Sequence, residues 1–515
     1  MLLPDVHTHH TRSTMIGCHQ KLTIRLAMAA CLFSVAPAAA QTSDQIQSLV
    51  AQIRELRVAL DAMQEQVAGS RRESEELRRE LQAVRDQLDS LKRATGAQVT
   101  PPSGAPGAGD RIDAVAVEQD LLKAKVEDQE QTKVESGSKY HVRLSGLALL
   151  NIVGTRGSID SLDLPGIAQA TEPGESGGSF SAGVRQSLIG LEVFGPTFGG
   201  AKTSGDVTFD FFGGFPSTND GVNSPLVRLR TTKLTLEWKN TSVVAGQDGL
   251  FFSPRSPTSL ASTAYPALSS SGNLWTWTPQ VHVEHRIPLT DDSTLTLAGG
   301  ILDAFTGELP AREYSRMATA GERSRAPAQA VRIGWQRAGD QPVAVGAGAY
   351  HASQNWGFDR TVDAWAAMTD WDVPLGPWFA LSGELYRGQA IGGLGGGASG
   401  SVLFDGAPTA PASAVLALRS TGGWSQLKFK PVSRLEFNAA YGKDHSTRDD
   451  IARLLAIGSL DPSAVNRNGS GFLNAIYQAR SNLLFSVEYR RLWTTGFDDV
   501  QHTADHISLS TGIVF

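Results

Sequence analysis

The last ten residues of the chain, 506 to 515, alternate between apolar and polar positions. Ile507, Leu509, Thr511, Ile513 and Phe515 fall on one face of an extended segment, and His506, Ser508, Ser510 and Gly512 fall on the other. A period of two indicates a β-strand with one apolar face. This segment therefore predicts a strand that reaches the last residue of the chain.

The same alternation recurs throughout residues 139–515. We count sixteen such segments. They begin at 140, 185, 201, 226, 241, 279, 293, 329, 342, 361, 377, 413, 434, 471, 482 and 505. Together they predict an all-β transmembrane barrel of about sixteen antiparallel strands, with apolar side chains facing lipid and polar side chains facing the lumen. The phenylalanine at the end of the last strand is typical of the closing strand of bacterial outer-membrane barrels.

The connections between these segments alternate between long and short. Long connections are predicted at 154–184, 249–278, 304–328, 389–412 and 443–470, and short ones at positions such as 195–200, 239–240 and 290–292. An outer-membrane barrel has short turns on the periplasmic side and long loops outside. The rhythm therefore predicts an even number of strands with both ends of the barrel in the periplasm.

Residues 41–94 carry a different period. Between Ile46 and Leu91, mostly apolar residues recur at alternating spacings of three and four, with charged residues between them. This heptad pattern predicts a coiled coil, and a coiled coil requires partner chains, so we expect an oligomer. Residues 95–110 are rich in Pro, Gly and Ala and predict a flexible linker. Residues 111–136 predict a short helical segment.

Residues 1–40 are typical of a secretory signal peptide. Lys21 and Arg25 precede an apolar run, and three alanines at 38–40 provide a cleavage site. Met15 is a more usual start for such a signal, so residues 1–14 are expected to come from a mis-annotated start. Both cysteines lie within the signal, which excludes disulfides from the mature chain. The net charge of −6 does not indicate the basic surface that nucleic-acid binding requires.

Several strand sequences, together with the order of coiled coil and barrel, resemble the DcaP-like outer-membrane porins. The runs that carry the resemblance are SKYHVRLSGLALLN from Ser138, RQSLIGLEV from Arg185, GDVTFDF from Gly205, VRLRTTKLTLEW from Val227, VVAGQD from Val243 and PQVHVEHRI from Pro279. The resemblance implies a homotrimer of sixteen-stranded barrels in the outer membrane of a Gram-negative type of cell, with the coiled coil in the periplasm. It also suggests anionic solutes.

Rings of charge set the selectivity of pores, so lumen-facing charges are the candidate functional residues. The alternation places basic residues in the lumen, and the loop at 249–278 is expected to fold inward and add Arg255 at the narrowest point. The candidate solute-selecting residues are Arg143, Arg228, Arg230, Arg255, Arg286, Arg332, Lys428 and Lys430. Two alternatives remain open: these residues could simply pair with Asp206, Asp210 or Glu284 and stabilise the wall, and 249–278 could be an ordinary surface loop.

These features predict a porin for passive diffusion of small hydrophilic solutes, with a preference for anions such as carboxylates. The expected partners are the other subunits of a homotrimer, outer-membrane lipid and lipopolysaccharide, and small anionic solutes. No catalytic motif, metal-ligand spacing or cofactor fingerprint is found. The alternative is a structural envelope tether, in which a closed barrel only anchors a periplasmic coiled-coil stalk.

Overall fold

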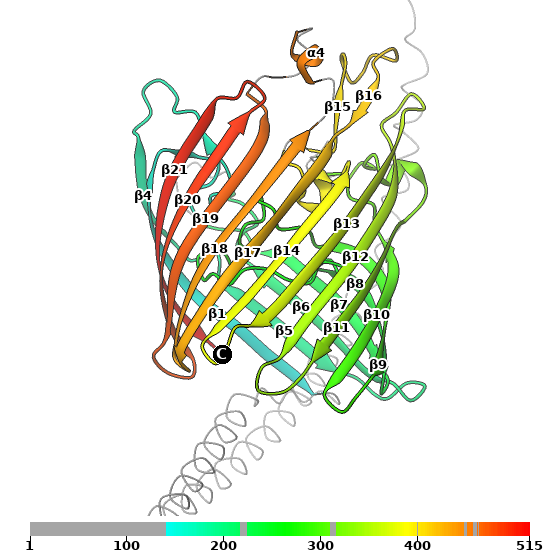
Figure 1. The fold of residues 1–515 in the computed structure, drawn as a ribbon, viewed down its shortest axis with the longest axis vertical. Helices are drawn as coiled ribbons and strands as arrows, with labels where there is room; N and C mark the ends of the chain where they lie inside the picture. The colour runs from blue at the N-terminus through cyan, green and yellow to red at the C-terminus, as the bar shows by residue number, and fades with distance from the viewer. Residues whose placement is uncertain are drawn as a thin grey trace, which may run out of the picture. The chain divides into compact units, whose positions relative to one another are not determined.

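The structure is a computed structural model that describes residues 141–216, 224–308, 316–398, 400–447, 451–456, 461 and 463–515. The predicted signal peptide, coiled coil, linker and short helix, residues 1–136, lie outside the described residues. The described part forms a barrel (Figure 1). No helix in it is both long enough and apolar enough to span a membrane.

Every strand of the wall is antiparallel to its neighbours. Strands in one direction are β1 (Val142–Arg156), β6 (Lys202–Asp210), β8 (Thr241–Asp248), β10 (Ser293–Leu302), β12 (Val343–Asn355), β14 (Phe379–Gln389), β18 (Leu435–Thr447) and β20 (Leu483–Gly496). Strands in the other direction are β4 (Gly178–Gly183), β5 (Leu188–Phe194), β7 (Arg228–Glu237), β9 (Thr278–Pro288), β11 (Ala328–Arg337), β13 (Thr361–Pro374), β17 (Arg419–Val432), β19 (Val465–Gln478) and β21 (Gln501–Val514). We call the end of the barrel where β1 begins and β21 ends the turn rim, and the opposite end the loop rim.

The described wall has sixteen strand positions. Its sheet contains seventeen strands, but β4 and β5 both pair with β1 and together make one interrupted strand, so 17 − 1 = 16. The sheet closes where β1 pairs with β21, in a register that runs from Leu147 opposite Val514 to Arg156 opposite Asp505. Closure leaves no unpaired strand edge, which a lipid environment requires. The predicted fold of the barrel is therefore confirmed.

Short elements lie in the connections at the loop rim. They are β2 (Ser158–Ile159) with β3 (Ala168–Gln169), β15 (Val402–Phe404) with β16 (Val415–Ala417), the 3₁₀ turns η1 (Glu322–Ser324) and η2 (Gly392–Leu394), and the helix α4 (Ile451–Ala456).

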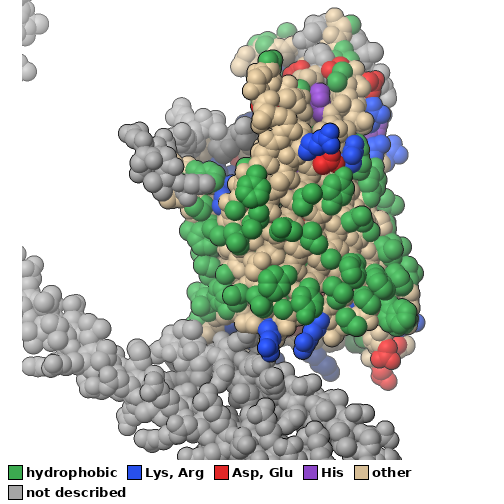
Figure 2. All heavy atoms as spheres, turned by 90° about the vertical axis from the view of Figure 1, so that its left-hand side faces the viewer, with side chains coloured by type: hydrophobic (Ala, Val, Ile, Leu, Met, Phe, Trp, Pro, Cys, Tyr) green, Lys and Arg blue, Asp and Glu red, His purple; other side chains and the backbone are tan. Residues whose placement is uncertain are grey.

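The two faces of each strand differ as the alternation predicts. In β21, the side chains of Ile507 and Leu509 are 52% and 50% exposed, whereas Ser508 and Ser510 are 1% and 3% exposed. On the face of the barrel that Figure 2 shows, hydrophobic side chains gather in a belt, with Lys and Arg side chains above and below it. The apolar face thus points outward, as a lipid-facing wall requires.

The inner face is less polar than predicted. On β12 to β14 the inward residues include Tyr350, Ala366 and Met368, all buried in a cluster with Leu250 and Phe252 of the 249–277 connection. The prediction of a wholly polar lumen is therefore wrong for this part of the wall. Its apolar side chains are tolerated because an inward-folded loop covers them and removes their surface from water.

The strands differ from the predicted boundaries mainly at the loop rim. β4 falls inside a predicted long connection, the predicted strand from 413 is divided into β16 and β17, and β12, β18 and β19 reach further than expected. Residues 356–360 and 497–500 are short connections at the loop rim, so the predicted alternation of long and short connections is only partly correct.

Candidate functional site

The connection between β8 and β9, residues 249–277, folds into the lumen. Phe252, Ala264 and Asn273 in it are 0% exposed, which a surface loop could not achieve. Part of this segment is visible as green trace inside the barrel (Figure 1). The prediction that this loop folds inward is confirmed, and the alternative of an ordinary surface loop is wrong. We call residues 249–277 the inward loop.

Two buried carboxylates of the wall anchor the inward loop. Glu384 on β14 accepts hydrogen bonds from the backbone N–H of Leu274 (3.0 Å) and from the Ser253 hydroxyl. Glu488 on β20 accepts one from the hydroxyl of Ser259 (2.5 Å). Glu384 is 0% and Glu488 1% exposed. Buried charges need such partners, so these bonds fix the loop against two strands that lie four positions apart in the wall.

The two arginines predicted on β7 lie beside this loop, and Arg228 is the more tightly bound. Its Nε and Nη2 donate to the two carboxylate oxygens of Asp210 at 3.0 and 2.6 Å. Its Nη1 donates to the Tyr265 hydroxyl (2.6 Å), and Nη2 also reaches the Ala264 carbonyl (3.0 Å). Asp210 is 0% exposed, so this bidentate pair is largely structural.

Arg230 is held more loosely. Its Nε is 3.8 Å from the Asp210 carboxylate, beyond hydrogen-bonding distance. Its guanidinium lies over the ring of Trp277, 4.7 Å from the centroid, and its Nη1 is buried with no hydrogen-bond partner in the described part of the chain. Arg230 therefore keeps donors that its protein neighbours do not use.

A third arginine extends this arrangement. Arg185 lies over Phe212 at 4.1 Å from the ring centroid, and Arg228 lies 5.5 Å from the same ring. Arg185 also pairs with Asp163 at 2.5 Å. We call this series, in which arginines alternate with aromatic rings, the arginine ladder. Its members are Arg185, Phe212, Arg228, Tyr265, Trp277 and Arg230.

Arg255 and Arg332 form a second group, separate from the ladder. Both reach Asp370 on β13, Arg255 through Nε at 2.7 Å and Arg332 through Nη2 at 2.9 Å. Arg255 also contacts Asp372 at 3.2 Å. The positive charges of Arg255 and Arg332 are therefore balanced by the negative charges of Asp370 and Asp372. In this structure Arg255 holds the inward loop against β13, whereas the sequence analysis expects it only to add positive charge at the narrowest point.

The remaining predicted residues lie near the turn rim. Arg143 is 3.6 Å from Glu192, Arg286 is 3.2 Å from Glu237 and 3.5 Å from Glu284, and Lys428 is 3.1 Å from Glu436. Lys430 has no ion pair within the part of the chain that the structure describes. It lines, with Lys428, a hollow of about 520 Å³ at this rim.

Sequence reasoning missed several members of these groups. Asp370 and Asp372 lie at a spacing of two around Trp371, which could have placed both on one face of β13. They were missed because the same inward face carries Ala366 and Met368, so the face has no uniform polarity. Arg185 lies just before β5, and Asp163 lies in a long connection where no alternation exists to assign it.

Comparisons with known proteins agree with this architecture. No protein-family model matches the chain, and no curated protein sequence matches it. Among solved structures, the outer-membrane channel DcaP of Acinetobacter baumannii superposes with a TM-score of 0.55 at 16% identity, over 73% of this chain and 99% of that one.

Two further solved structures are less similar. Pseudomonas putida OprB gives a TM-score of 0.45 at 11% identity (73% of this chain, 94% of that chain), and an anion-selective porin from Comamonas acidovorans gives 0.44 at 10% (73% and 100%). At these scores neither carries an argument. The DcaP likeness confirms the resemblance at the level of the fold: the chain has the closed sixteen-stranded barrel fold of the DcaP outer-membrane channel.

Proposed function

We propose that the chain is an outer-membrane porin that lets small hydrophilic solutes diffuse passively and favours anionic ones such as carboxylates. The observation that carries the proposal is the arginine ladder, in which three guanidinium groups face two carboxylates beside the loop that narrows the lumen. The apolar outer belt and the closed wall support the placement in a membrane.

The charge balance of the ladder favours anions over cations. Asp163 neutralises Arg185 and Asp210 neutralises Arg228, so the charge of Arg230 is in excess. A guanidinium presents its donors in a planar fork that matches a carboxylate, and Arg230 has donors to spare. The Arg230 side chain is 14% exposed, so its unbalanced charge can attract a passing carboxylate in the lumen.

The hollow at the turn rim does not strengthen this preference. Lys428 and Lys430 line it, and of the two only Lys428 pairs with an acid among the described residues, namely Glu436. Arg337 and four aspartates line the same hollow, so its lining carries no excess of positive charge. The preference for anions therefore rests on the arginine ladder.

The proposed assembly is a homotrimer with a periplasmic coiled coil. Its support is the heptad pattern of residues 41–94, because a coiled coil requires several chains. Chemical cross-linking of the purified full-length protein tests it, and a trimeric band is the expected result.

Conductance in a planar bilayer tests the function. Purified protein should give discrete current steps, and under a gradient of KCl the reversal potential should have the sign of a chloride-preferring pore. A reversal potential of the sign expected for a cation-preferring pore would contradict the anion preference, but it would still agree with a porin function.

The tether remains the second candidate because several connections occupy the lumen together with the inward loop. The Cβ of an alanine at Gly166 would approach Ser270 at 2.8 Å, and one at Gly395 would approach Trp275 at 2.9 Å. If these segments seal the barrel, the purified protein will insert into the bilayer and give no current steps. That outcome would favour the tether.

A further inference from the structure

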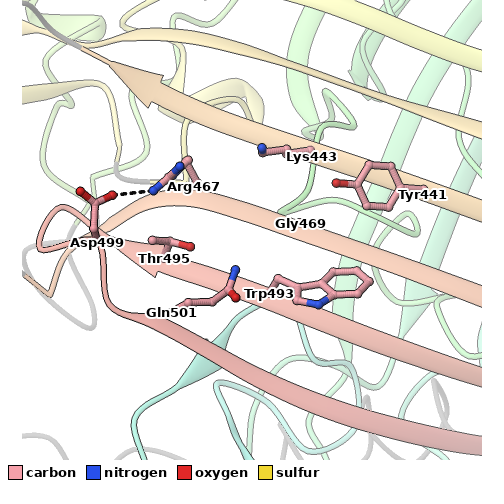
Figure 3. Close-up of a pocket in the computed structure, with 8 residues that line it drawn as sticks. All are labelled: Tyr441, Lys443, Arg467, Gly469, Trp493, Thr495, Asp499 and Gln501. Atoms are coloured by element: carbon pink, nitrogen blue, oxygen red, sulfur yellow. Dashed lines mark hydrogen bonds and ion pairs between the residues drawn. The ribbon is translucent and has the colours of Figure 1, made fainter.

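A hollow on the outside of the barrel has the features of a binding site. It has a volume of about 500 Å³ and lies on β18 to β21, near the loop rim (Figure 3). Its lining residues are Tyr441, Lys443, Arg467, Gly469, Trp493, Thr495, Asp499 and Gln501. None of these belongs to the lumen site.

The hollow arises from two glycines that face outward on β19. An added Cβ at Gly469 would lie 3.7 Å from the Tyr441 hydroxyl and 3.9 Å from the Trp493 ring, and one at Gly471 would lie at similar distances from the same two rings. Tyr441 and Trp493 stand on either side, with ring centroids 6.2 Å apart. The missing side chains therefore leave a trough with aromatic walls.

Basic side chains lie at the loop-rim end of this trough. Lys443 is exposed and makes no ion pair with the described residues, while Arg467 pairs with Asp499 at 2.5 Å and keeps a buried Nε without a partner. Arg491 lies against the outer side of Trp493, 6.0 Å from its ring centroid. Figure 2 shows Lys, Arg and His side chains gathered on this side, above the hydrophobic belt.

On β18 the outward residues change from apolar through aromatic to basic toward the loop rim, from Phe437 through Tyr441 to Lys443. On β20 aromatic and basic residues alternate beyond Val487, from Tyr489 through Arg491 to Trp493. Apolar residues suit acyl chains, aromatic residues suit the membrane interface, and basic residues suit anionic headgroups. The surface is thus complementary to an anionic lipid lying along the wall.

We propose that this hollow binds the phosphorylated headgroup of lipopolysaccharide. Lys443 and the exposed part of the Arg467 guanidinium would contact a phosphate, while Tyr441 and Trp493 would hold the sugar and the first part of the acyl chains. A negatively charged glycolipid is favoured because the hollow combines unused positive charge with an apolar floor at the edge of the hydrophobic belt. The proposal rests on the proposed outer-membrane orientation, in which the loop rim faces the lipopolysaccharide leaflet.

Binding of diphosphoryl lipid A to the detergent-purified protein, followed by native mass spectrometry, tests the proposal. The variant Lys443→Ala/Arg467→Ala should bind at least about tenfold more weakly, because it removes two charge-assisted contacts. The matched control is Lys239→Ala/Arg434→Ala, which removes the same charge from exposed positions of the turn rim and should bind like the original protein. Lipid A without phosphates should bind weakly to all three.

A second variant separates the shape of the hollow from its charge. Gly469→Leu keeps every charge and would fill the trough, since an added Cβ there meets only ordinary contact distances. It should also lose lipid A binding while folding normally. All variants should conduct ions as the original protein does, so a failure of this proposal can be told from a failure of the porin proposal.

Equal binding of diphosphoryl lipid A by the original protein, by Lys443→Ala/Arg467→Ala and by Gly469→Leu would overturn the proposal. So would equal binding of the phosphate-free lipid. A second copy of the chain could instead cover the hollow. In that case Lys443→Ala/Arg467→Ala and Gly469→Leu will change the oligomeric mass in light scattering, whether or not lipid is added. That result would also overturn the proposal.

Discussion

Two arginines on one strand of this barrel have the same charge and different roles. Arg228 makes four hydrogen bonds, two of them to the fully buried Asp210, whereas Arg230 lies 3.8 Å from the same carboxylate. A residue that uses four of its five N–H donors stabilises the wall, and one whose charge is not balanced can act on a solute. Both sequence-level interpretations, selectivity and wall stability, therefore have a physical basis, at different residues.

Arg230 is expected to set ion preference. Arg230→Ala should lower the anion-to-cation permeability ratio about fivefold, because a unit charge about 8 Å from an ion in a water-like dielectric stabilises an anion by about 0.5 kcal/mol and destabilises a cation by the same amount. Reversal potentials under a salt gradient measure this ratio. Arg230→Lys keeps the charge, so it should keep the ratio but lose affinity for a dicarboxylate that blocks the current. An unchanged ratio in Arg230→Ala would remove this residue from the site.

Arg228 is expected to set stability. Arg228→Ala leaves the buried Asp210 without its bidentate partner, which should lower the free energy of unfolding by about 2–3 kcal/mol. Urea titration of the protein in lipid vesicles measures the loss. In Arg228→Ala/Asp210→Asn the stranded charge is absent, so part of the loss should be recovered. An equal loss in both variants would contradict this explanation.

The sequence placed Arg228 and Arg230 correctly on one face but could not rank them. Both obey the same alternation, and their difference depends on Tyr265 and Trp277, which the inward loop brings to them. Contacts between residues far apart in sequence leave no local pattern. The same limit explains why the sequence did not pair Arg255 with Asp370, which lies 115 residues further on.

At the scale of elements, the inward loop is the part of the barrel whose position controls the lumen. Strands β13, β14 and β20 hold it, through Asp370, Glu384 and Glu488. The ion pair of Arg255 with Asp370 and Asp372 is the contact on the β13 side.

Removing this contact should loosen the loop. Arg255→Ala is expected to raise the single-channel conductance and the current noise, because the loop loses charge-assisted hydrogen bonds worth roughly 1.5–3 kcal/mol each. Arg255→Lys is the matched control: it preserves the charge but cannot bridge two carboxylates with a planar fork, so its noise should be intermediate. Single-channel recordings in planar bilayers provide both quantities. A quiet, unchanged channel in Arg255→Ala would show that the other anchors hold the loop alone.

The strands could be predicted because each of them must present an apolar outer face to the lipid. The resulting alternation of apolar and polar residues located all sixteen strand positions. Outside the hydrophobic belt this demand ends. β4, with the sequence GSFSAG, and the loop-rim ends of β12 and β18 therefore carry no apolar alternation and were missed or cut short.

At the scale of the whole molecule, the chain carries a net charge of −6, which by itself would repel anions. The pore is nevertheless expected to favour anions. The two statements agree because an ion in the lumen responds to nearby charges, and salt screens distant ones. The Debye length is about 10 Å at 0.1 M salt and about 3 Å at 1 M.

Screening therefore predicts how selectivity depends on ionic strength. At a mean salt concentration of 0.1 M, Arg230 and Lys430 should act on an ion some angstroms away, and the pore should favour anions. At 1 M the ratio of anion to cation permeability should fall toward one, since a charge then acts only on ions in near contact. Reversal potentials measured at equal concentration ratios across the bilayer at both ionic strengths give the comparison.

In Arg230→Ala the permeability ratio should change less between the two ionic strengths, because the charge being screened is gone. If the ratio is the same at both ionic strengths, pore width rather than lumen charge selects the solute, and the arginine ladder is only part of the wall.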